Sequence, residues 1–76
     1  MPRFSTIFVR HVGSFSTNSI QIDAFNALKE IGASDLNVDT ESENEVTISY
    51  NRPTSEVLWV DFHKHGVTNK AWSDNK

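Results

Sequence analysis

The chain has 76 residues, with seven basic and ten acidic side chains and a formal net charge of −3. This length suits one small domain, and because cysteine is absent, neither a disulfide nor a thiolate zinc cluster can stabilise it. No apolar run approaches the roughly 20 residues that span a bilayer, and the first residues lack the apolar core of a signal peptide. We therefore expect a cytoplasmic protein without membrane contact.

The negative charge is concentrated in one part of the chain. Residues 31–50 contain no basic side chain, and their acidic residues are Asp35, Asp39, Glu41, Glu43 and Glu45. Proteins that bind nucleic acids normally need clustered lysine and arginine to displace counterions from the phosphates. The charge pattern therefore makes a nucleic-acid partner unlikely.

The first predicted element is a strand over residues 4–12, rich in β-branched and aromatic residues. Alternation places Ile7 and Val9 on one side and Phe4, Phe8 and Val12 on the other. A strand that is apolar on both sides is typical of the interior of a sheet, or of a sheet that is covered on both faces.

The second predicted element is a helix over residues 20–31. A loop over residues 13–19 precedes it, and Asn18 or Ser19 is suited to cap its first turn. Gly32 follows, where a left-handed residue usually ends a helix. Ile22 is the one apolar residue on the polar side, and the apolar side is formed by Ile20, Ala24, Phe25, Ala27, Leu28 and Ile31.

The remaining chain predicts three strands separated by polar turns, over residues 36–40, 45–50 and 57–64. In the last of these, Leu58, Val60 and Phe62 are expected to point inward. Residues 67–76 are mostly polar and predict a flexible tail outside a domain that covers residues 1–66. The predicted fold is α+β with the order β-α-β-β-β, in which one helix packs on a mostly antiparallel four-stranded sheet.

One helix is a narrow cover for such a sheet. Four strands are about 19 Å wide at a spacing of about 4.8 Å, whereas a helix is about 10 Å across. Phe4, Phe8, Val57 and Trp59 are therefore candidates for uncovered apolar surface. Because large exposed apolar patches usually mark interaction sites, we expect a second copy or another protein on the sheet. In the alternative, the tail folds back and Trp72 fills the gap.

The residues predicted to contact a partner combine an aromatic side chain with the acidic hairpin. Trp59 could be an aromatic anchor at an interface, or it could pack beneath the tail. The acidic hairpin could steer a basic partner toward the domain, or it could be a solvated turn kept soluble by its charges. The predicted protein-binding residues are Trp59, Asp39, Glu41, Glu43, Glu45 and Arg52.

Asp61, His63 and His65 form a candidate metal site. They alternate along the last predicted strand, so all three could point to one side of the sheet. Two imidazoles and a carboxylate are ligands that zinc accepts. The alternative is that the histidines are solvated at the end of a strand that terminates near Gly66.

The predicted function is a small, non-catalytic protein-binding module, regulatory or inhibitory, that acts through its sheet face and acidic hairpin. Homodimerisation is expected, and no cofactor is predicted. No serine or histidine belongs to a recognisable catalytic constellation, and so small a domain has little depth for an enzyme pocket. One alternative is a metal-binding domain or small metal-dependent enzyme centred on Asp61, His63 and His65. Another is a ligand-binding or nucleic-acid-binding sheet module.

Overall fold

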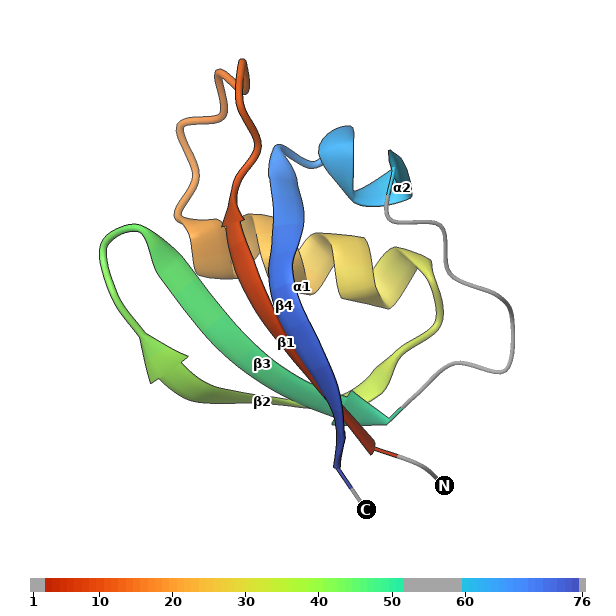
Figure 1. Ribbon diagram of the computed structural model, residues 1–76. Helices are drawn as coiled ribbons and strands as arrows, with labels where there is room; N and C mark the ends of the chain where they lie inside the picture. Colours follow the sequence, from red (N-terminus) through yellow and green to blue (C-terminus); the bar gives the residue numbers. More distant parts are fainter. Residues whose placement is uncertain (1–2, 52–59, 76) are drawn as a thin grey trace.

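The computed structural model describes residues 3–51 and 60–75, with the backbone alone at residues 60, 61 and 71–75. Its elements alternate in the order β-α-β-β-α-β, which is that of the split β-α-β arrangement (Figure 1). The predicted α+β fold, with one helix packed on a four-stranded antiparallel sheet, is confirmed. The elements are β1 Arg3–Arg10, α1 Ile20–Glu30, β2 Ser34–Glu41, β3 Glu45–Asn51, α2 Val60–His63 and β4 Val67–Asn75.

The strands lie in the spatial order β2-β3-β1-β4, and each neighbouring pair is antiparallel. β1 is central: residues 3–9 pair with β3, and residues 3–10 pair with β4. β1 and β2 consequently run parallel with β3 between them, so the chain must cross over from one end of the sheet to the other. α1 makes this crossing behind the sheet (Figure 1).

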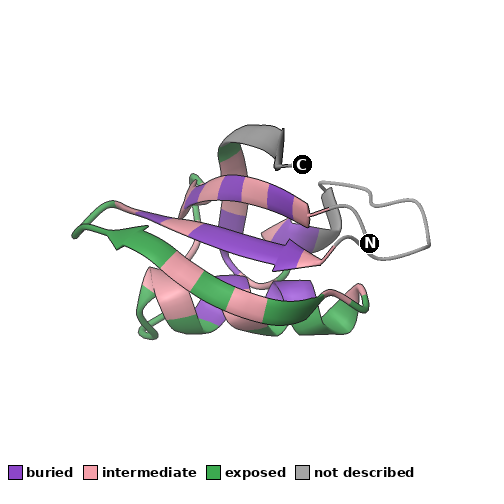
Figure 2. Ribbon diagram, turned by 90° about the horizontal axis from the view of Figure 1, so that it is seen from below, coloured by how far each residue is buried: buried purple, intermediate pink, exposed green. Residues whose placement is uncertain are grey.

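The hydrophobic core lies between the sheet and the two helices, whereas β2 forms an exposed edge (Figure 2). Inside it, the Thr6 and Tyr50 hydroxyls share a buried hydrogen bond of 2.8 Å, which satisfies both polar groups. Half-buried apolar residues surround the core on α1 and β2. The buried apolar residues are Phe4, Phe8, Ala24, Ala27, Leu28, Val46, Ile48, Tyr50, Phe62 and Val67.

Two residues predicted to be uncovered apolar surface lie in this core instead. Phe4 and Phe8 alternate with Thr6 on the inner face, and Phe8 packs edge-on against Phe62 with ring centroids 5.4 Å apart. The prediction is wrong for Phe4 and Phe8, because Phe62 of α2 covers Phe8 and Phe4 packs edge-on against Tyr50 with ring centroids 6.1 Å apart. Val57 and Trp59, the other two candidates, lie outside the described residues.

The helix is confirmed together with its cap. Ser19 is the N-cap, and its hydroxyl accepts a hydrogen bond of 3.2 Å from the amide of Ile22. Ile22 is 51% exposed, as expected for the one apolar residue on the polar side. Gly32 follows the helix with a φ of +89°, a conformation that glycine adopts without steric cost.

The last part of the chain differs from the prediction. Where a strand was expected over residues 57–64, residues 60–63 form α2, and residues 57–59 lie outside the described part. The flexible tail predicted over residues 67–76 is wrong for residues 67–75, which form β4. Local composition accounts for both errors. Residues 60–63 include β-formers but form a helical turn, from which Phe62 contacts Phe8. Residues 67–75 are mostly polar but form a strand, because they pair with β1.

Candidate functional site

A partly buried ion pair anchors the loop between β1 and α1. The Arg10 guanidinium pairs with the Asp23 carboxylate, whose side chain is only 6% exposed. Arg10 also donates to the carbonyl oxygen of Asn18 at 2.7 Å, and the Asn18 side-chain nitrogen donates to Asp23 at 3.3 Å. Both ends of the connection are thereby tied to one charged centre at the start of α1.

The electrostatic environment of Asp23 favours its charged form. Burial by itself raises the pKa of this carboxyl group, but hydrogen bonds from Arg10, Ser16 and Asn18, together with the positive charge of Arg10, outweigh it. The pKa of Asp23 therefore lies below its usual range, as expected for a carboxylate held by several donors. This pair serves as an internal support of the loop.

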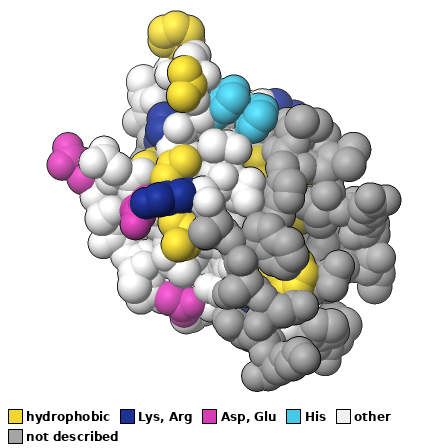
Figure 3. Space-filling model, viewed as in Figure 1, with side chains coloured by type: hydrophobic (Ala, Val, Ile, Leu, Met, Phe, Trp, Pro, Cys, Tyr) yellow, Lys and Arg dark blue, Asp and Glu magenta, His cyan; other side chains and the backbone are white. Residues whose placement is uncertain are grey.

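The loop projects two apolar side chains into solvent. Val12 is 91% exposed and Phe15 is 96% exposed, while Gly13 between them has a φ of +87°. The loop extends beyond the end of β1 and the start of β4 (Figure 1). Apolar atoms are exposed at that end of the surface (Figure 3). Its base rests on Gly66, where a Cβ atom would lie 2.5 Å from the Ser14 hydroxyl. The exposed tip thus stands on a closely packed base.

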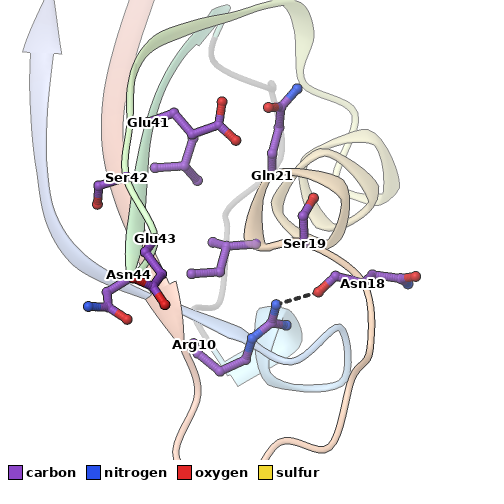
Figure 4. A pocket seen from close by; sticks show the side chains of 10 residues that line it. Arg10, Asn18, Ser19, Gln21, Glu41, Ser42, Glu43 and Asn44 are labelled. Atoms are coloured by element: carbon purple, nitrogen blue, oxygen red, sulfur yellow. Dashed lines mark hydrogen bonds between the residues drawn. The ribbon is translucent and has the colours of Figure 1, made fainter.

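A groove of about 490 Å³ separates the start of α1 from the β2–β3 hairpin. Ile20 of α1 is half-buried in its lining, Val46 of β3 lies beneath it almost fully buried, and Glu41 and Glu43 come from the hairpin. Figure 4 shows the hairpin side chains on one side of the groove and those of Asn18, Ser19 and Gln21 on the other, with Arg10 at one end. We call this cavity the acidic groove.

One contact bridges the acidic groove, and two others order the hairpin turn at its side. With its nitrogen turned toward Glu41, the Gln21 side-chain amide lies 3.2 and 3.3 Å from the two carboxylate oxygens. At the hairpin turn, the Ser42 amide donates to the Glu45 carbonyl at 2.8 Å, and the Ser42 hydroxyl accepts from the Glu45 amide at 3.2 Å. The carboxylates at the hairpin are therefore carried on an ordered turn.

The predicted acidic residues of the hairpin divide between two faces of the molecule. Glu41 and Glu43 line the acidic groove. Asp39 bonds the Ser49 hydroxyl and accepts from Asn37 at 2.8 Å, and Glu45 pairs with Lys70 at 2.9 Å. An irregularity in the pairing of β2 with β3 between residues 38 and 40 accounts for the change of side along β2.

Two of the predicted binding residues, Trp59 and Arg52, lie outside the described residues. Conversely, the sequence reasoning did not single out Val12 or Phe15 as candidates for binding. Val12 was assigned to the first strand, whereas the strand ends at Arg10. A phenylalanine within the hydroxyl-rich loop of residues 13–19 was the available signal, because a large apolar side chain in a surface loop has few core neighbours.

The histidines of the predicted metal site have different partners. The His63 ring stacks on that of His11, with centroids 3.8 Å apart, and its Nε2 lies 3.2 Å from the Thr68 hydroxyl. His65 contacts Glu30, which also pairs with Lys64. Hydrogen bonds from Lys64 and His65 hold the pKa of Glu30 below its usual range.

Asp61 belongs to α2, and its side chain lies outside the description. Within the side chains that are described, no three histidine, aspartate or glutamate residues come together in a way that could hold a metal ion. The alternative of a metal-dependent function stays a prediction, and the observed contacts of His63 and His65 do not favour it.

Comparisons of the chain with protein-family models, curated proteins and solved structures found no match. Function is therefore inferred from the geometry of this chain alone. Within the described ranges, 3–51 and 60–75, neither helix has the length and apolar character required to cross a bilayer.

Proposed function

We propose that this chain is a small, non-catalytic protein-binding module of the cytoplasm, with a regulatory or inhibitory role. Its contact surface is formed by the β1–α1 loop and the β2–β3 hairpin. The main support for this proposal is the near-complete exposure of Val12 and Phe15 on a loop that is anchored at its base. An exposed phenylalanine loses water-contacting apolar area when it enters a partner's pocket, which favours binding.

The surrounding contacts support a binding role for this loop. Arg10 ties its start to Asp23 and to Asn18, so the loop gives up less conformational freedom on binding than an untethered segment of the same length. The adjacent hairpin adds exposed carboxylates that steer the encounter with a basic partner. Aromatic anchors beside charged groups are common features of protein interfaces.

The sheet face contributes less to the proposed contact than the sequence predicted. On the side away from α1, Ile7 and Val9 of β1 are half-buried, and the Glu45–Lys70 pair belongs to the strands on either side. On β3, Ile7 pairs with Thr47 and Val9 pairs with Glu45. This side is mainly polar within the described residues, so the fully exposed apolar residues of the loop are the stronger candidates.

The proposal is tested by comparing variants in affinity capture from a lysate of the source organism. We expect a protein captured by the unchanged chain to be lost, by about tenfold or more, when Val12→Ser and Phe15→Ser are combined, because aromatic anchors dominate interface energetics. Both side chains are exposed, so the double variant should keep the circular dichroism and melting temperature of the original.

The matched control is Ile22→Ser, which removes a partly exposed apolar side chain from α1, away from the loop tip. This variant should retain the captured protein. Equal capture by all three chains, or loss in the Ile22 variant alone, would contradict the proposed surface.

A further inference from the structure

We draw no further inference here: the strongest candidate, the stacked His11–His63 ring pair between the end of β1 and α2, would act only through its titration, and nothing in the described residues shows which carboxylate faces it, because the side chain of Asp61 in α2 lies outside the description.

Discussion

Asp23 and its partner Arg10 anchor the loop of the candidate site. It is the only buried charged residue among the side chains that are described, and its partner Arg10 is 29% exposed. A buried carboxylate that lost its cation would be costly, whereas the pair with its additional hydrogen bonds is satisfied. Asp23 belongs to α1, and its burial follows from its pairing with Arg10 at the end of β1.

We predict that Asp23→Asn lowers the free energy of unfolding at pH 7 by about 2–3 kcal/mol. Breaking a buried pair costs more than this in a fully dry site, but Arg10 can reach water. Urea unfolding measures the difference, with Glu43→Gln as a control in which little change is expected because Glu43 is exposed.

The same pair predicts a pH dependence with a definite sign. Because the pKa of Asp23 is lower in the folded than in the unfolded chain, its stabilisation is fully present above about pH 4 and is lost as the pH falls through the folded-state pKa. The stability difference between the original chain and Asp23→Asn should therefore shrink on acidification. A difference that stays constant down to low pH would contradict this assignment.

At the scale of elements, β4 was the least predictable part of the chain. It is an edge strand, so one side of its backbone pairs with β1 while the other side has no described neighbour. An edge strand needs few apolar residues, and Val67, which is fully buried, supplies one of them. Its pairing partner lies nearly 60 residues away at Arg10, a contact that local composition does not encode.

We predict that a chain truncated after Gly66 does not fold. Removing β4 takes away the hydrogen-bonding partner of β1 and uncovers the core beside Phe8. Circular dichroism and thermal melting should show the loss of a cooperative transition. The milder variant Val67→Ala should remain folded and lose about 2 kcal/mol, the combined effect of two buried methyl groups and the cavity they leave. A truncated chain that melts like the original would support the flexible tail instead.

At the scale of the whole molecule, the two edges of the sheet differ. β2 carries carboxylates, and its pairing with β3 is irregular at two places, features that discourage pairing with another chain. β4 is the more regular edge along its paired residues, with one irregularity opposite residues 7 and 8. The homodimer expected from the sequence stays a prediction, and sheet extension at β4 is the geometry that the topology favours.

Light scattering coupled to size exclusion tests this prediction. We expect a mass about twice the 8.6 kDa of one chain at high protein concentration, decreasing toward the mass of one chain on dilution if pairing is weak. A mass of one chain at every concentration would contradict the homodimer and leave the proposed binding of a different protein unaffected.

The helix, its Ser19 cap, the inner residues of β3 and the α+β class follow from the sequence itself, because periodicity and capping act between neighbouring residues. Contacts between distant residues decided the rest. Pairing with β1 makes the polar residues 67–75 a strand, and Phe62 contacts Phe8 from a helical turn. The Arg10–Asp23 pair anchored the loop that exposes Val12 and Phe15, and the pairing irregularity in β2 divided the predicted acidic residues between the acidic groove and the opposite side. These outcomes depend on which distant segments become neighbours, and the tertiary structure alone determines those neighbours.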